Sequence, residues 1–224
     1  MNPELLLLWI PAILFSIIVH EYAHGLVAKF CGDETAMRMG RLTLNPIPHI
    51  DLIGTIILPA ILIASHSGAL FGWAKPVPVN PANFRNRRYD SIWVSAAGPV
   101  TNILLALVAG FALRFYAPAE ATHWTRLLAV ELGLFFQLNI GLSFFNLLPI
   151  PPLDGSHILA GVLPPAAVGT YLKIAKYVFY GLMGAWAVDA VFHVGIFNML
   201  LGPLFTPYMN FWQWVVFGRE VVSL

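Results

Sequence analysis

Long apolar stretches alternate with short polar segments along the whole chain. A helix that crosses a bilayer needs about 20 mainly apolar residues, and the longest stretches reach that length. The pattern predicts transmembrane helices over residues 4–30, 89–116, 124–148, 168–191 and 196–217, the last containing two prolines. A short amphipathic helix is predicted over residues 156–163.

The segments between the predicted helices differ in character. Residues 52–70 are apolar again but contain Gly54, Pro59, His66 and Gly68. Residues 72–90 carry too many prolines for a helix and suit an extended path. The sequence MRMGRLTL, residues 37–44, is typical of a short strand or hairpin at the membrane surface.

Composition supports a membrane protein. Of 224 residues, 58% are hydrophobic and only 10% are charged, whereas soluble domains carry about 25% charged residues. The polar stretches are too short to fold as soluble domains, so residues 1–224 are expected to form a single membrane-embedded domain. The expected fold is an all-α polytopic membrane protein with five to six transmembrane helices, a re-entrant segment and a short β-hairpin.

Charge and termini narrow the class further. The formal net charge of +1 argues against a nucleic-acid partner. Cys31 is the single cysteine, so neither an internal disulfide nor a cysteine metal cluster can form. The N-terminal stretch lacks a basic start and a small-residue cleavage site, so it is expected to be a retained transmembrane helix.

The sequence His-Glu-Tyr-Ala-His lies near the end of the first predicted helix. Residues four apart share one helical face, so His20 and His24 can reach a single metal ion. Glu21 then lies beside the metal rather than on it, as a general base requires. The alternative is a pair of hydrogen-bonded core histidines, but ionisable groups within a membrane span usually serve a function.

A catalytic zinc site needs a third protein ligand. The contenders that reach a similar depth are Asp51, His66, Glu131, Asp154 and His157. Asp154 is favoured because it follows a proline-broken helix end and because the next residue is a glycine, which allows close backbone approach. The alternative role for Asp154 is that of an N-cap for the helix over residues 156–163.

Topology and charge agree with this choice. Asp154 shares a membrane face with His20 and His24 only if an even number of crossings separates them, which requires residues 52–70 to be re-entrant or a hairpin and not a single span. In that arrangement ten of the twelve basic residues lie on one face, with only Arg114 and Arg126 on the other. The positive-inside rule makes the basic face, and the metal site, cytoplasmic.

Three motifs together resemble the site-2 protease family of intramembrane metalloproteases: HEYAH, AAGPVTN and NLLPIPPLDG. The segments GWAKPVPVNP and RLTLNPIPHID are similar to its compact prokaryotic branch, and neither of the PDZ and CBS modules of many members is expected. The resemblance implies that Asp154 is the third zinc ligand and that Asn146 holds the substrate or the oxyanion. It also implies that Gly98, Pro99 and Asn102 serve close helix packing or substrate contact.

The expected function is therefore that of an intramembrane zinc metalloendopeptidase with one Zn²⁺ per chain. Glu21 is the expected general base, and the substrate is a transmembrane protein or peptide in the bilayer of the cell membrane. MRMGRLTL and the re-entrant segment are candidate edges for pairing with an unwound substrate strand. The rival reading is a non-catalytic membrane zinc scaffold or carrier.

Overall fold

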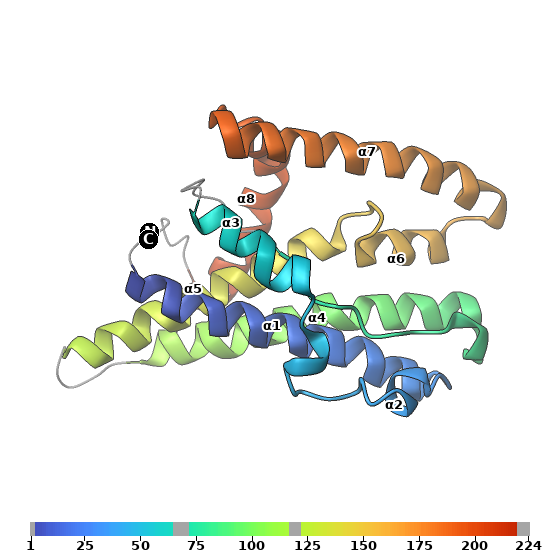
Figure 1. Ribbon diagram of the computed structural model, residues 1–224, viewed down its shortest axis with the longest axis horizontal. Helices are drawn as coiled ribbons and strands as arrows, with labels where there is room; N and C mark the ends of the chain where they lie inside the picture. Colours follow the sequence, from blue (N-terminus) through green and yellow to red (C-terminus); the bar gives the residue numbers. More distant parts are fainter. Residues whose placement is uncertain (1–2, 65–71, 117–121, 219–224) are drawn as a thin grey trace.

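The computed structural model describes residues 3–64, 72–116 and 122–218. Every regular element within these ranges is a helix. The long ones, shown in Figure 1, are α1 (Pro3–Phe30), α4 (Arg87–Phe115), α5 (His123–Leu147), α7 (Pro165–Phe192) and α8 (Ile196–Phe217). Their bounds follow the apolar stretches of the sequence closely, so the prediction of an all-α protein is confirmed.

Short elements connect the long helices. They are α2 (Thr35–Arg38), η1 (Ile47–His49), η2 (Leu52–Ile57), α3 (Leu58–Ala64), η3 (Pro81–Asn83) and α6 (Asp154–Val162). Polar side chains mark where several helices begin: the Asn86 side chain accepts hydrogen bonds from two backbone N–H groups of α4, and Thr122 accepts one from α5.

Helices α1, α4 and α5 pack side by side and form the centre of the molecule (Figure 1). Small residues let α4 approach its neighbours: a Cβ atom added to Gly110 would lie 2.8 Å from Phe136 of α5 and 2.9 Å from Val216 of α8. Packing of this kind holds helices together in a membrane, where lipid tails are as apolar as the side chains. Helix α6 lies between α4 and α7 (Figure 1).

Helices α7 and α8 form one strongly bent pair. The chain bends by 117° from one to the other, and the turn between them places His193 and Gly195 in the left-handed conformation. The Asp189 carboxylate accepts the first N–H groups of α8, from Ile196 and Phe197. This side chain therefore stabilises the bend by satisfying donors that a helix start leaves unpaired.

The number of membrane spans is smaller than predicted. In the described residues, three helices are long and apolar enough to cross a bilayer, and the bent α7–α8 pair raises the number to four at most. The prediction of five to six spans was wrong because length and hydropathy do not reveal a sharp bend. Pro203 and Pro207 do not break α8, which runs through both.

The predicted β-hairpin at residues 37–44 was also wrong. Thr35–Arg38 form α2, and the rest of this segment has no strand in the described structure. Backbone bonds from Arg38 to Glu34 and from Met39 to Thr35 close a helical turn. The Arg41 side chain then donates to the carbonyls of the proline-rich segment instead of lying on a hairpin.

The residues that flank the two ends of segment 52–70 lie next to each other. The Lys75 N–H donates to the His49 carbonyl, and the Trp73 N–H donates to the Gly54 carbonyl. The Thr55 hydroxyl also donates to the Trp73 carbonyl, at 2.8 Å. These bonds join both ends of the segment that was predicted to be re-entrant, although residues 65–71, including His66, lie outside the described residues.

Candidate metal centre

The two histidines of HEYAH meet Asp154 at the start of α6. His20 and His24 lie one turn apart on α1 and are 7% and 8% exposed. Their Nε2 atoms are 3.0 Å apart, and Asp154 Oδ2 lies 3.2 Å from that of His20 and 3.3 Å from that of His24. These three residues form a group that could hold a metal ion.

The other ring nitrogen of each histidine faces an acceptor. His20 Nδ1 lies 2.6 Å from Asn102 Oδ1, and His24 Nδ1 lies 2.7 Å from the Val94 carbonyl oxygen. A neutral imidazole carries one hydrogen, and both acceptors require it on Nδ1. The lone pairs of both Nε2 atoms therefore point toward Asp154.

This arrangement fits a zinc ion. Asp154 Oδ2 is buried without a hydrogen-bond partner, so three lone-pair atoms face one another with no hydrogen between them. A tetrahedral zinc site with bonds of about 2.0–2.1 Å places its ligand atoms about 3.3–3.4 Å apart. The observed spacing of 3.0–3.3 Å is close to that value, and nitrogen and carboxylate oxygen are ordinary zinc ligands.

Gly98 of α4 lies directly against the histidine pair. A Cβ atom added there would lie 2.5 Å from the Nε2 atoms of both His20 and His24. The motif AAGPVTN predicted close helix packing, and the neighbours prove to be the imidazoles themselves. Pro99 lacks an N–H group, so the Ser95 carbonyl one turn earlier loses its helical donor. The preceding residue, Val94, supplies the carbonyl that accepts the His24 hydrogen bond.

Asp154 is held in place from both ends of α6. It is the first residue of the helix rather than its N-cap, which is Leu153, so the capping alternative does not apply. Gly155 packs so closely on the end of α5 that an added Cβ would lie 2.5 Å from the Leu148 carbonyl oxygen. At the other end, the Arg88 guanidinium donates to the last carbonyls of α6, including that of Gly161 at 2.6 Å.

The proline-rich segment covers Glu21. The Val77 N–H donates to Glu21 Oε2 at 2.8 Å, and the Val77 side chain packs against Gly25 of α1. Residues 72–80 have no regular secondary structure, as the prolines of this segment predicted. The contact with Glu21 was not predicted, because nothing in the sequence pairs a backbone N–H with a distant carboxylate.

Asp33 anchors the same segment at the end of α1. Its carboxylate accepts hydrogen bonds from the Asn80 N–H at 2.7 Å and from the Asn83 side chain at 2.8 Å, and it also binds Thr35. Burial raises the pKa of Asp33, but these hydrogen bonds outweigh it and hold the pKa below its usual range. Asp33 therefore stays ionised at neutral pH and keeps the segment over the histidines.

A cavity of about 370 Å³ opens beside the three metal-binding atoms. Glu21, Asn146 and His157 line it, together with residues of the proline-rich segment. The Asn146 amide donates one hydrogen to the Leu142 carbonyl at 3.0 Å. The structure thus brings the predicted base and the predicted oxyanion residue to the same cavity as the metal-binding group.

The remaining contenders for the third ligand lie elsewhere. Asp51 caps η2 by accepting from Ile53 and Gly54 N–H groups. Glu131 is a partly buried residue in the first half of α5 and is not part of the metal-binding group. His157 lines the cavity, but it too lies outside that group.

Long apolar helices together with a His-Glu-x-x-His pair and a carboxylate define the class of membrane metalloproteases. The sequence profile of peptidase family M50 matches residues 116–188, which include Asn146 and Asp154. "Putative zinc metalloprotease YwhC" of Bacillus subtilis is 42% identical over 175 residues, which are 76% of this chain and 74% of the relative. The chain therefore belongs to peptidase family M50, the site-2 protease family.

Other relatives carry the same description. Rip2 of Mycolicibacterium smegmatis is 35% identical over 153 residues, covering 68% of this chain and 56% of the relative. The protein sll0528 of Synechocystis is 29% identical over 207 residues, covering 84% of this chain and 50% of the relative. The chain thus spans about half the length of these two relatives. No solved structure gives a significant match.

Proposed function

We propose that the chain is an intramembrane zinc metalloendopeptidase that hydrolyses peptide bonds in or near transmembrane segments of its substrates, as in regulated intramembrane proteolysis. The observation that carries this proposal is the meeting of three lone-pair atoms within 3.3 Å of one another, in a cavity that Glu21 also lines. A protein that only bound zinc would have no use for Glu21, whereas hydrolysis requires a base at that position.

His20, His24 and Asp154 would hold one Zn²⁺ per chain. When bound, zinc supplies a Lewis acid that polarises the scissile carbonyl and lowers the pKa of water. Two imidazoles and one carboxylate leave a position open for substrate or water, as catalytic sites do. Gly98 supports the proposal because it leaves the histidine nitrogens uncovered on the α4 side.

Glu21 is the proposed general base. It takes the proton of the attacking water and delivers it to the leaving amine. The Val77 N–H holds Glu21 Oε2, which leaves Oε1 to accept the proton. Asn146, on the wall of the same cavity, would donate its second amide hydrogen to the developing oxyanion.

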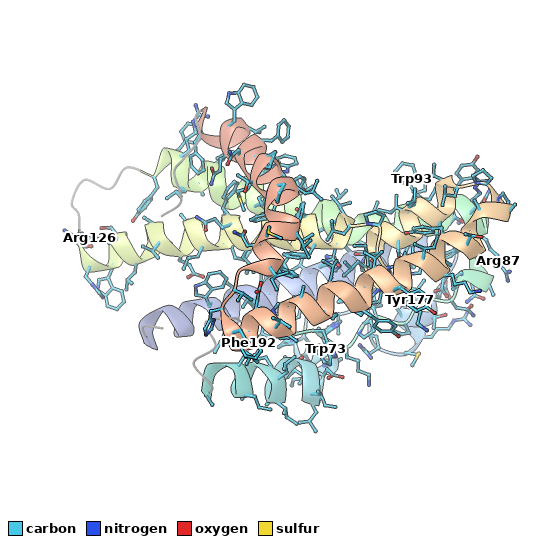
Figure 2. All side chains as sticks on the ribbon, turned by 90° about the horizontal axis from the view of Figure 1, so that it is seen from above. Trp73, Arg87, Trp93, Arg126, Tyr177 and Phe192 are labelled. Atoms are coloured by element: carbon cyan, nitrogen blue, oxygen red, sulfur yellow. The ribbon has the colours of Figure 1, made fainter. Side chains whose placement is uncertain are left out.

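The proposed orientation places the metal site near the cytoplasmic face of the cell membrane. Helices α4 and α5 run in opposite directions, so Arg87 and Arg126 lie at opposite ends of the molecule (Figure 2). The end with Arg87 also carries the C-terminal end of α6, whose last carbonyls accept from Arg88, and the end of α1 next to Lys29, where the Cys31 carbonyl accepts from the Arg85 N–H. The excess of basic residues at this end supports the assignment through the positive-inside rule.

A transmembrane helix has its backbone groups bonded internally, so a substrate must unwind before cleavage. Residues 52–75 support a re-entrant arrangement, because both ends of this segment are hydrogen-bonded together. We propose that a substrate strand reaches the cavity beside this segment. Helix-weakening residues near the cytoplasmic end of a substrate should therefore promote its cleavage.

Cleavage in liposomes tests this function. The purified chain is reconstituted with single-helix peptides that carry glycine and proline near the cytoplasmic end, and with control peptides that carry leucine instead. We expect cleavage of the first set, its loss on metal removal with a chelator, and its return on addition of zinc. A chain that cleaves no peptide but moves zinc into vesicles loaded with a zinc-sensitive dye would be a carrier, and the proposal would be wrong.

A further inference from the structure

A hydrogen-bonded series of buried polar side chains leads from His20 into the middle of the helix bundle. Ser16 of α1, Asn102 of α4 and Asn139 of α5 each have no exposed surface. They lie inside the three helices that are long enough to cross a membrane, where an unsatisfied polar group is costly. Three such groups in contact therefore need an explanation beyond packing.

Backbone carbonyls fix the direction of the hydrogen bonds at the end of this series that lies farthest from His20. The Ser16 hydroxyl donates to the Ala12 carbonyl at 2.7 Å, so its oxygen accepts from Asn139 Nδ2 at 2.9 Å. The other hydrogen on Asn139 Nδ2 goes to the Phe135 carbonyl, also at 2.9 Å. Because a carbonyl can only accept, Asn139 must turn its own Oδ1 toward Asn102.

This orientation of Asn139 in turn fixes which atom of Asn102 faces His20. Asn139 Oδ1 accepts from Asn102 Nδ2 at 2.8 Å, and the second hydrogen on that nitrogen faces the Ser16 carbonyl at 3.5 Å. Asn102 Oδ1 is therefore left to face His20 Nδ1, at 2.6 Å. Two acceptors cannot bond to each other, so His20 must carry its hydrogen on Nδ1.

The neighbouring histidine is oriented without any side chain. His24 Nδ1 donates directly to the Val94 carbonyl, whose direction is fixed by the backbone. His20 depends instead on an amide, which can rotate by half a turn and offer a donor in place of an acceptor. His20 is therefore the ligand whose hydrogen position other side chains can change.

We propose that Asn139 is a positioning residue that fixes the Nδ1–H tautomer of His20 through Asn102 and so sets the affinity of the site for zinc. This inference rests on the proposed zinc site. Asn139 does not touch the metal-binding atoms. It acts by holding the Asn102 amide in the one orientation that leaves His20 Nε2 free to bind a metal. A partner of this kind commonly changes metal affinity by about 10–100-fold when it is lost.

The direct test compares replacements of Asn139 that do and do not offer an acceptor to Asn102. Leucine has a similar volume but no acceptor, so Asn139→Leu should weaken zinc binding by about 10–100-fold. Aspartate presents an acceptor to Asn102 in either protonation state, so Asn139→Asp should retain the affinity of the wild type. Affinity is measured by competition with a zinc chelator of known strength.

A double variant separates positioning from a general loss of packing. A carboxylate at position 102 only accepts, so in Asn102→Asp the His20 hydrogen stays on Nδ1 whatever residue occupies position 139. The double variant Asn102→Asp/Asn139→Leu should therefore bind zinc as tightly as Asn102→Asp alone. A structural role for Asn139 would instead lower the affinity of both backgrounds equally. This comparison also applies if Asn139→Leu alone does not fold.

The tautomer itself is read from the imidazole ¹⁵N resonances of metal-free protein with labelled histidine, with His20 assigned by substitution. We expect the Nδ1–H form in the wild type and a loss of that form in Asn139→Leu. Ser143→Ala is the matched control, because Ser143 of α5 makes buried hydrogen bonds that do not involve Ser16, Asn102 or Asn139. An unchanged tautomer and unchanged zinc affinity in Asn139→Leu would overturn the inference. A wild type that binds no zinc would instead contradict the proposed function, and the ¹⁵N spectra would still report on Asn139.

Discussion

Replacing Gly98 with alanine is expected to abolish zinc binding and peptide cleavage together. The added methyl group would lie 2.5 Å from the Nε2 atoms of both His20 and His24, well inside van der Waals contact. Neither ring can retreat, because each is held at Nδ1 by an acceptor on α4. Zinc per chain, measured by atomic absorption, and cleavage in liposomes should both fall to background.

Gly141→Ala is the control for this change. Gly141 lies in α5, and an added Cβ would meet nothing within 4 Å. This variant should keep full zinc content and full cleavage, since alanine also favours a helix more than glycine does. A Gly98→Ala variant that kept one zinc and full activity would contradict the location of the metal centre.

Replacing Asp154 with asparagine is expected to lower zinc affinity by more than about 100-fold, since losing a ligand should cost more than losing a supporting hydrogen bond. The amide has the same shape, so α6 should keep its position through Gly155 and Arg88. Only the negative charge and the lone pair on Oδ2 are lost. Zinc competition measures the effect, and cleavage at low free zinc should vanish with it.

Asp51→Asn provides the matched control. Asp51 was another candidate for the third ligand, but its carboxylate caps η2. Asparagine caps a helix about as well as aspartate does. Its zinc affinity should equal that of the wild type. If Asp51→Asn lost zinc while Asp154→Asn kept it, the assignment of the third ligand would be wrong.

Much of the fold follows from local sequence properties. The long helices were predicted because apolar runs of sufficient length can be read directly, and His20, Glu21 and His24 because one helical turn brings them together. Asp154 was predicted from chemistry and topology, and the structure brings it to the two histidines. That it binds zinc stays a prediction.

The features that the sequence did not reveal depend on contacts between distant segments. The bend at His193 lies between two apolar helices that look like separate spans. The role of Asn139 depends on Asn102 and Ser16, and the three residues come from three different helices, so no spacing rule could connect them. The Val77 N–H that holds Glu21 is a backbone group, and backbone groups carry no sequence signal.

The most direct test of the proposed metalloprotease is zinc content and cleavage measured on the same samples of wild type and Glu21→Gln. Glutamine can still accept the Val77 N–H, but it cannot take a proton from water. Glu131→Gln, which removes a carboxylate of α5 outside the cavity, is the control. We predict one zinc per chain in all three, with cleavage at least about 100-fold lower in Glu21→Gln alone. Equal cleavage by wild type and Glu21→Gln at equal zinc content would contradict the proposed metalloprotease with Glu21 as its general base.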